Sequence, residues 1–498
     1  MKIDSQKYVL SIDLGTSGVK ASIWDLNGRM VNVRTIKVPR IVTDNGFIEQ
    51  DPVLLLNKQL KAVKLVLQES RINPVELASI GIANQRESVV AWNKDTGRPL
   101  YNVISWMDRR TSFGPSSETT ELRSYVKERT GLLLDPYFSA PKMAWLVEHI
   151  RRKYGGGLDS FLKLGTLDSW IVWKLTSGKS YVTDWSNASR TMLFDFHRGT
   201  WDSGLLENFK LQEDLLPNVV DSVNPGVTTD RSILGSEIEI GGIAGDQQAS
   251  LFGHLALNVG EMKSTYGTGS FILVNAGGQV PKTDRLISTI AWKERGKKPV
   301  YAVEGNAFST GSLMEWAKNN LNIINRFSDS ERFAIKAKAE HGLYFVPALE
   351  GLGAPYWNRD VRAGLMGLTS VTTRAEIVRA ILESIAYITR DIIEQIRKET
   401  GLKPRELRVD GKLSSNGFLM QFLSDLIGVP LHVSRNTEMT SAGAAFLAIK
   451  ASRELNVRRL KEELSGVKEV KPTINRGEVQ SHYEGWKRAV QAMMNVYA

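Results

Sequence analysis

The chain has 498 residues, of which 42% are hydrophobic and 24% are charged, and it contains no cysteine. A chain of this length exceeds one ordinary hydrophobic core, so we expect two large domains. The absence of cysteine excludes disulfides, thiolate zinc sites and a cysteine nucleophile. The net charge of +10 comes from Lys and Arg residues interleaved with acids, so we expect no nucleic-acid partner.

The N-terminal apolar run, Tyr8 to Ile12, stops at Asp13. It is too short for the core of a secretory signal. No stretch of the sequence approaches the roughly 18 uninterrupted apolar residues that indicate a membrane span. We therefore interpret the run as the first strand of a cytoplasmic protein that does not insert into a membrane.

The first forty residues have the pattern of strands joined by tight turns. We expect strands at Tyr8–Asp13 and Lys20–Trp24 on either side of a Gly-Thr-Ser-Gly turn, and a third strand at Arg29–Val38. The pattern partly recurs later, with strands expected at Met262–Tyr266 and Phe271–Val274 around a Gly-Thr-Gly-Ser turn. This internal echo predicts two similar domains, residues 1–255 and 256–498, with a nucleotide between their hairpins.

Helical and strand-like runs alternate in both halves, which is typical of an α/β protein. Ala375–Lys398 has isoleucines at helical spacing. A short strand is expected at Leu407–Val409 and a helix at Asn416–Ile427. A strand, a loop and a helix N-terminus in that order can present backbone N–H groups to a phosphate.

Two common nucleotide-binding motifs are missing from the sequence. There is no Gly-x-x-x-x-Gly-Lys-Ser/Thr, and no Gly-x-Gly-x-x-Gly follows a strand. The six histidines are scattered, which argues against a dedicated zinc site. The nucleotide site must therefore be of another type.

Two acidic residues stand out. Asp246 follows the small-residue stretch Gly241–Gly245, where a ligand can approach the backbone closely and a lone carboxylate can act as a general base. Asp13 precedes Thr16 and Ser17, whose N–H and hydroxyl groups can cradle phosphate oxygens while Asp13 holds Mg²⁺ through water. The alternative for this turn is an ordinary hairpin. Together the two acids predict a small-molecule kinase.

A polar segment, Asn84-Gln85-Arg86-Glu87, follows the predicted strand Ala78–Ile82. Side chains at the carboxyl end of a strand project into a crevice, where Arg86 and Glu87 offer a donor and an acceptor to a polyol. The alternative is a surface ion pair. Trp106 and Tyr137 are either core aromatics or walls of the same site.

These residues resemble the carbohydrate-kinase family that contains glycerol and pentulose kinases, along nearly the whole chain. The matching stretches are Asp13–Ser17, Gly81–Glu87, Ser105–Arg110, Asp135–Trp145, Thr183–Phe194, Gly245–Gly253, Thr265–Gly269, Gly351–Trp357 and Val409–Phe422. Within the family, the segments around Arg86 and Asp246 match glycerol kinases rather than pentulose kinases.

The resemblance implies two actin-like (ribonuclease H-like) ATPase domains with ATP and Mg²⁺ in the interdomain cleft. It implies transfer of the γ-phosphoryl group to a terminal hydroxyl of glycerol, with Asp246 as the base and Asp13 serving the metal. The implied glycerol-binding residues are Arg86, Glu87, Trp106, Tyr137, Asp246, Gln247 and Phe271. The implied nucleotide-binding residues are Thr16, Ser17, Gly18, Lys20, Thr268, Gly269, Gly311, Glu315, Gly411, Lys412 and Asn416.

Four residues depart from the family pattern: Leu14, Lys20, Glu315 and Lys412. Lys412 stands where a second glycine is expected, and a positive φ there would cost about 1–2 kcal/mol, unless its amine offsets this by pairing with a phosphate. One alternative is a binding paralogue that has lost turnover through Lys412 and Glu315. Another is a kinase of the same fold for another polyol or ketose, against which only the pocket residues argue. Dimers are common among the relatives, so we expect a homodimer.

Overall fold

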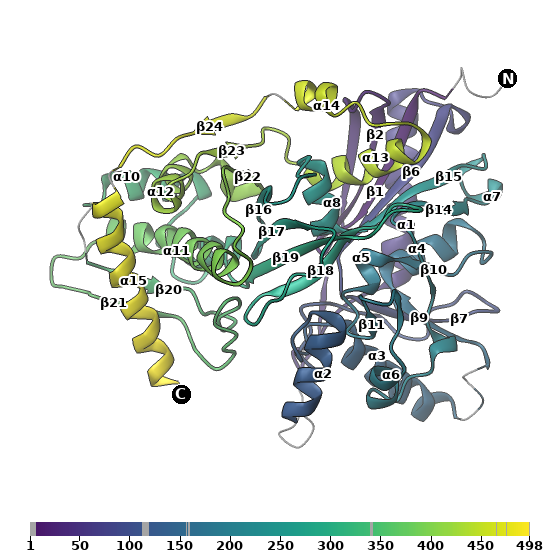
Figure 1. The fold of residues 1–498 in the computed structure, drawn as a ribbon, viewed down its shortest axis with the longest axis horizontal. Coiled ribbons are helices and arrows are strands. Elements are labelled where there is room, and N and C mark those ends of the chain that lie inside the picture. The colour runs from purple at the N-terminus through teal and green to yellow at the C-terminus, as the bar shows by residue number, and fades with distance from the viewer. Residues whose placement is uncertain are drawn as a thin grey trace.

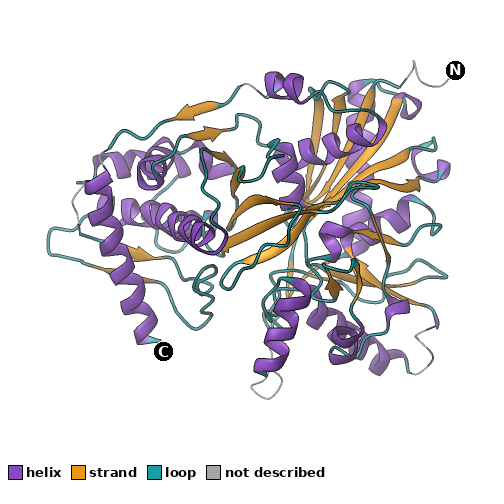
Figure 2. Ribbon diagram, in the orientation of Figure 1, coloured by secondary structure: helices purple, strands orange, loops and turns teal. Residues whose placement is uncertain are grey.

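The computed structural model describes residues 6–111, 119–155, 157, 160–338, 342–464, 466–474 and 476–497. Two mixed sheets form the centres of the two halves of the chain, with helices around them (Figures 1 and 2). No helix within these residues is long and apolar enough to span a bilayer.

The first sheet has the strand order β3–β2–β1–β6–β15–β14. Strand β2 is antiparallel to both of its neighbours, β3 and β1, and β6 and β15 continue parallel to β1. The strands are β1 (Tyr8–Leu14), β2 (Gly18–Asp25), β3 (Met30–Lys37), β6 (Leu77–Asn84), β14 (Val223–Thr228) and β15 (Glu239–Gly245). The predicted N-terminal hairpin is confirmed, since β1 and β2 pair from Tyr8–Asp25 to Leu14–Val19.

The second sheet has the order β18–β19–β17–β16–β22–β23–β24. Its five central strands, from β19 to β23, repeat the order and directions of β3–β2–β1–β6–β15. The strands are β16 (Met262–Tyr266), β17 (Ser270–Gly277), β18 (Ile287–Trp292), β19 (Val300–Ala307), β22 (Leu407–Asp410), β23 (Leu431–Val433) and β24 (Lys468–Val470). This repetition confirms the prediction of two similar actin-like domains.

Helices cover both sheets. The helix predicted at Ala375–Lys398 spans Arg374–Thr400, begins with a Thr373 capping box and ends at the left-handed Gly401. The longer helices are α1 (Pro52–Ser70), α2 (Thr120–Thr130), α3 (Ser139–Tyr154), α4 (Leu167–Leu175), α8 (Asp246–Gly253), α9 (Gly311–Asn319), α10 (Phe327–Lys336), α11 (Arg374–Thr400), α12 (Gly417–Ile427), α13 (Met439–Ser452) and α15 (Arg476–Val496).

Two of these helices join the halves. Helix α8 follows β15 and helix α13 follows β23, so each follows the last parallel strand of its sheet, and the two pack together. A Cβ atom on Gly443 would lie 1.7 Å from the carbonyl oxygen of Ala249, and one on Gly253 would lie 2.1 Å from that of Met439. Glycine is therefore required for this close approach. Helix α13 also lies on β1, β6 and β15, so it covers the first sheet although it comes late in the sequence.

A smaller sheet is inserted in the first half, between β3 and β15. Its strand order is β4–β5–β8–β7–β9, and helices α2 and α3 lie in the chain between its strands β8 and β9. The strands are β4 (Ile41–Val42), β5 (Ile48–Gln50), β7 (Val89–Asn93), β8 (Val103–Ile104) and β9 (Leu162–Thr166). This insertion supplies Trp106, just after β8, and Tyr137, just before α3.

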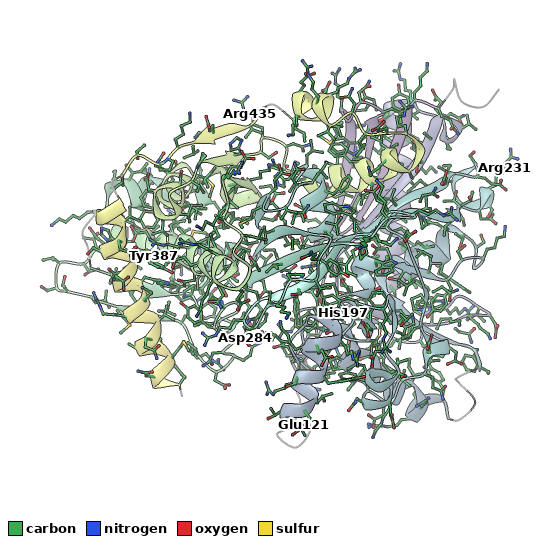
Figure 3. The ribbon with its side chains drawn as sticks, viewed as in Figure 1. Glu121, His197, Arg231, Asp284, Tyr387 and Arg435 are labelled. Atoms are coloured by element: carbon green, nitrogen blue, oxygen red, sulfur yellow. The ribbon has the colours of Figure 1, made fainter. Side chains whose placement is uncertain are left out.

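The core of the second half is held by α11 and α15. Tyr387 of α11 (labelled in Figure 3) stacks on Trp486 of α15, with ring centroids 5.3 Å apart. The buried Asp391 carboxylate of α11 accepts hydrogen bonds from the Tyr483 hydroxyl at 2.5 Å and the Trp486 indole at 2.8 Å. Both apolar packing and satisfied polar groups thus fix α15 on the second domain.

Candidate active site

Asp246 begins α8, directly after the last parallel strand of the first sheet. Its Oδ1 atom accepts the Gln247 backbone N–H at 2.7 Å and lies 3.2 Å from Arg86 Nε. The side chain remains 27% exposed, so the carboxylate can still reach a ligand. A Cβ atom on Gly245 would lie 2.7 Å from the Arg86 side chain, which explains why a small residue precedes the acid.

Arg86 and Glu87 follow the end of β6 and are almost fully buried. Arg86 donates to both carboxylate oxygens of Glu304, at 2.5 and 3.3 Å. Arg190 donates to Glu87 at 2.6 Å and to Glu304 at 3.0 Å. Buried charges are tolerated only when they are paired in this way. Because Glu304 lies in β19 of the second sheet, the network ties the predicted polyol site to both halves.

The carboxylates of this network respond differently to their surroundings. Burial raises the pKa of Glu87, although Arg190 and Arg86 oppose it. Burial also works against the charged form of Glu304, but Arg190 and Arg86 together hold the pKa of that carboxyl below its usual range. Glu304 is therefore the anion on which the two guanidinium groups converge.

Three aromatic side chains meet beside Arg86. The Trp106 ring lies 5.8 Å from the Tyr137 ring and 6.2 Å from the Phe271 ring, both edge to face. The Arg86 guanidinium lies 5.6 Å from the centroid of Phe271. The Trp106 indole donates to the Thr16 hydroxyl at 2.9 Å, which links the three rings to the turn of the β1–β2 hairpin. The structure thus brings together all the predicted polyol-binding residues.

Asp13 lies near the end of β1 and is 6% exposed. Burial raises the pKa of its carboxyl to about 7; Lys20 opposes this rise, and the nearby carboxylates of Asp246 and Glu438 add to it. No cluster of three acidic or histidine side chains that could hold a metal occurs among the described residues. Asp13 as the residue that serves Mg²⁺, through the waters of a largely hydrated ion, stays a prediction.

Lys20 is the cation nearest to Asp13 along the hairpin. Its amine forms an ion pair with Glu438, at 2.6 Å. Burial works against its charged form, but Asp13 and Glu438 raise the pKa of Lys20 above its ordinary value. The Lys20 ammonium thus interacts with two carboxylates, that of Asp13 in the hairpin and that of Glu438 at the N-cap position of α13.

The second hairpin, between β16 and β17, contacts the start of α9. The Gly311 N–H donates to Gly267 at 2.9 Å, and the Thr310 N–H donates to Thr268 at 3.0 Å. A Cβ atom on Gly311 would lie 2.4 Å from the Gly267 carbonyl oxygen, so this helix start needs glycine. Gly311 is therefore a neighbour of the turn that carries Thr268 and Gly269, and the nucleotide contacts expected of these residues stay predictions.

The segment after β22 shows whether Lys412 is strained. Gly411 adopts a positive φ of 93°, and Lys412 then begins a 3₁₀ turn. Lys412 does not have a positive φ, so its backbone is not strained in the way a left-handed lysine would be. Glycine takes up the left-handed conformation one residue earlier, and Lys412 lies exposed on the surface, as does Glu315.

Asn416 is placed at the N-cap of α12. Its side chain accepts the Leu419 N–H at 2.9 Å and donates to the Ser330 hydroxyl at 3.2 Å. The buried carboxamide thus joins α12 to α10. These two contacts hold the fold together, and a contact of Asn416 with a nucleotide stays a prediction.

Several polar residues of the site were missed by the sequence analysis. Lys263 of β16 is fully buried and donates to Gln247 Oε1 at 2.5 Å and to Thr265 Oγ1 at 3.0 Å. Burial lowers the pKa of this amine to about 8. The signal was present in the sequence, since Lys263 and Glu304 are each the one charged residue of a buried strand.

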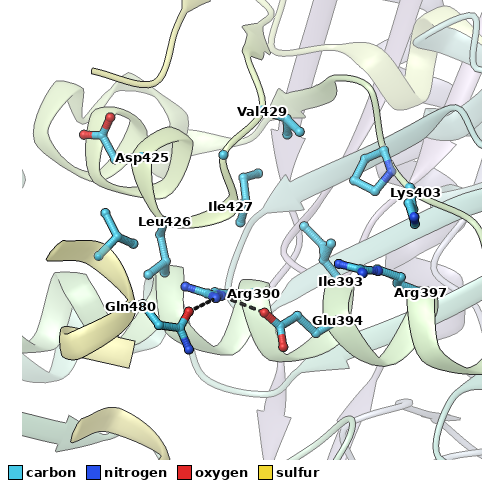
Figure 4. Close-up of a pocket in the computed structure, with 13 residues that line it drawn as sticks. Arg390, Ile393, Glu394, Arg397, Lys403, Asp425, Leu426, Ile427, Val429 and Gln480 are labelled. Carbon is cyan, nitrogen blue, oxygen red and sulfur yellow. Dashed lines mark hydrogen bonds and ion pairs between the residues drawn. The ribbon is translucent and has the colours of Figure 1, made fainter. Parts of the chain in front are cut away.

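A separate hollow lies between α11, α12 and α15 (Figure 4). Arg390 lines it, but its guanidinium already donates to Glu394 at 2.8 Å and to Gln480 at 2.7 Å. The hollow shares no residue with the site around Asp246. It is therefore not the place where the predicted chemistry occurs.

Two actin-like domains, with a hairpin from each beside one buried polar site, define a phosphotransferase of the actin-like class. The comparisons with known proteins identify the family. Residues 8–253 match the N-terminal domain, and residues 262–452 the C-terminal domain, of the FGGY family of carbohydrate kinases. The chain belongs to this family.

Individual relatives agree with the family match. The chain is 41% identical to a glycerol kinase of Caldanaerobacter subterraneus subsp. tengcongensis, covering 98% of this chain and 99% of that protein. It is 41% identical to glycerol kinase 2 of Thermotoga maritima, covering 97% and 98%. Among solved structures, glycerol kinase of Plasmodium falciparum with ADP is similar at a TM-score of 0.88 and 31% identity, with 98% of each chain covered.

Proposed function

We propose that this protein is an ATP-dependent glycerol kinase that forms sn-glycerol 3-phosphate. The observation that carries the proposal is the convergence of Arg86, Asp246 and three aromatic rings in one site. Charged groups there can pair with hydroxyls while the rings face a short carbon skeleton. Relatives named glycerol kinase, 41% identical over nearly the whole chain, support the choice of substrate.

Asp246 is the proposed base. Its position at a helix start, beside the Arg86 guanidinium, holds the carboxylate in one orientation while 27% of the side chain stays exposed. It would accept the proton of the terminal hydroxyl as that oxygen attacks phosphorus. Arg86, Glu87 and Gln247 would hold the remaining hydroxyls, and Trp106, Tyr137 and Phe271 would enclose the carbons.

The nucleotide would lie between the two hairpins. Backbone and hydroxyl groups of Thr16, Ser17 and Gly18 would face the phosphates from the first half, with Lys20 nearby. Thr268 and Gly269 would face them from the second half, and Gly311, Glu315, Gly411, Lys412 and Asn416 would line the nucleoside side. Bound Mg²⁺, held through Asp13, would neutralise charge on the phosphates.

The test is a coupled kinase assay with glycerol, erythritol, dihydroxyacetone and xylulose under one set of conditions. We expect the highest kcat/KM with glycerol. A higher value with another acceptor would contradict the glycerol assignment but keep the kinase assignment. Phosphate release without a phosphorylated acceptor, or ligand binding without turnover, would instead support a paralogue that has lost transfer.

Three further expectations belong to this proposal. The two functional units are residues 1–255 and 256–498, in agreement with the gap between the two family matches. A homodimer stays a prediction from the family resemblance, and a cytoplasmic location stays a prediction from the short N-terminal apolar run. Light scattering of the purified protein tests the first of these two, and fractionation of the source cells tests the second.

A further inference from the structure

Lys142 is a fully buried lysine that makes no contact with a carboxylate among the described residues. It lies near the start of α3 and its side chain turns back toward the segment before the helix. The Nζ atom donates to the carbonyl oxygens of Pro136, Tyr137 and Phe138, at 2.8, 2.7 and 2.7 Å. Three successive carbonyls thus share one amine.

The number of donors matches the number of acceptors. A lysine ammonium has three N–H donors, whereas the neutral amine has two N–H groups and a lone pair. Only the protonated form can satisfy all three carbonyls. A buried charge without a carboxylate partner is costly, so an apolar side chain of similar length would be the cheaper choice for packing alone.

The segment that Lys142 holds carries Tyr137. The Tyr137 ring contacts Trp106 at 5.8 Å and lies 5.9 Å from the Arg190 guanidinium. Within the described residues, no protein group forms a hydrogen bond with its hydroxyl, although the residue is only 1% exposed. The hydroxyl is therefore available to a bound polyol, and its position depends on the backbone of the Pro136–Phe138 segment.

We propose that Lys142 is a positioning residue for the acceptor site: its ammonium fixes the Pro136–Phe138 carbonyls and thereby places the Tyr137 hydroxyl against the substrate. Lys142 does not touch the substrate itself. The inference rests on the proposed function, because it takes Tyr137 as a contact of the polyol. It adds a dependence of acceptor binding on the protonation of one buried amine.

The charged groups around Lys142 make its protonation sensitive to neutral pH. Burial, then repulsion by Arg109, lowers the pKa of Lys142 to about 7, while Glu87, Asp135 and Asp108 oppose this shift. A lowered lysine pKa means that the third donor is present below about pH 7 and is lost as the pH rises through that value. Acceptor binding through Tyr137 should weaken in the same direction.

The experiment is a double-mutant cycle of Lys142→Met and Tyr137→Phe, with KM measured separately for glycerol and for ATP. Each single variant should raise the glycerol KM by about tenfold, the size of one lost hydrogen bond to substrate, with the ATP KM changed less than about threefold. The glycerol KM of the double variant should be no higher than that of the single variant with the higher KM. Lys153→Met, at an exposed lysine of the same helix, is the control and should match the wild type.

Additive effects in the cycle, or equal rises in both KM values, would overturn the proposal and leave Lys142 with a purely structural role. If Lys142→Met does not fold, the wild type and Tyr137→Phe decide the question. The glycerol KM of the wild type should rise between about pH 6 and about pH 8.5 more steeply than that of Tyr137→Phe; equal slopes would overturn the proposal.

These outcomes differ from failure of the proposed function. If the wild type phosphorylates no glycerol, the glycerol assignment fails before the cycle is read. The same cycle can then be run on whichever acceptor the substrate panel identifies, with the same expected pattern.

Discussion

Replacement of Asp246 by asparagine tests the proposed base with little change in shape. The amide oxygen can take the place of Oδ1, which accepts the Gln247 N–H at 2.7 Å and lies 3.2 Å from Arg86 Nε. The amide nitrogen then takes the place of Oδ2, so the side chain keeps its orientation but can no longer accept the proton. We expect turnover to fall by about 10²–10⁴, equivalent to about 2.7–5.4 kcal/mol of transition-state stabilisation.

Glycerol affinity, measured by calorimetry without nucleotide, should change far less than turnover. The change also removes one negative charge from a buried cluster in which three carboxylates, of Asp246, Glu87 and Glu304, face two guanidinium groups. The folded state should therefore not be destabilised. Asp44→Asn, at an exposed acid, is the matched control. More than about a tenth of wild-type turnover with intact binding would refute the role of Asp246 as base.

The remaining predictions concern the stability of the fold around the site, ATP binding and the choice of acceptor. Glu304→Gln leaves two buried guanidinium groups short of a partner and should cost about 3–5 kcal/mol in urea unfolding, whereas Glu462→Gln, in an exposed pair, should cost under about 1 kcal/mol. Gly443→Ala should cost about 1–3 kcal/mol or more, because its Cβ would lie 1.7 Å from a carbonyl oxygen; Gly278→Ala, with open space around it, should be neutral. Lys412→Gly should not tighten ATP binding, since calorimetric tightening would require the backbone strain that the 3₁₀ turn lacks. Propane-1,2-diol should have a kcat/KM at least about two orders of magnitude below glycerol, because one set of buried polar groups is left unpaired; near-equal values would contradict a pocket that pairs every hydroxyl.

Local signals in the sequence predicted much of the fold. Glycine turns and short apolar runs placed both phosphate hairpins, and isoleucine spacing placed α11, because these patterns depend on neighbours along the chain. The placement of Arg86 followed from its position at the end of a predicted strand, and that of Asp246 from the small-residue stretch before it. Each of these elements is confirmed by the structure.

Partners that are distant in sequence could not be predicted in this way. Arg86 and Glu304 are separated by 218 positions, and the sequence around either residue does not indicate that the other is its partner. The conformation of Lys412 was left open by the sequence; the positive φ falls on Gly411, where a Cβ atom would lie 2.4 Å from the Tyr266 carbonyl oxygen. Lys142 gave no signal at all, since its acceptors are backbone carbonyls that look alike in any sequence.

The seating of α13 on the first sheet limits how the chain can be divided. A Cβ atom on Gly81 of β6 would lie 2.0 Å from the Ala444 carbonyl oxygen, so that strand is shaped to receive a helix made some 360 residues later. During synthesis, the face of the first sheet that α13 covers stays exposed until nearly the whole polypeptide has left the ribosome. Assembly of the first domain is thus completed by the C-terminal part of the chain, and a truncated product cannot hide its apolar surface.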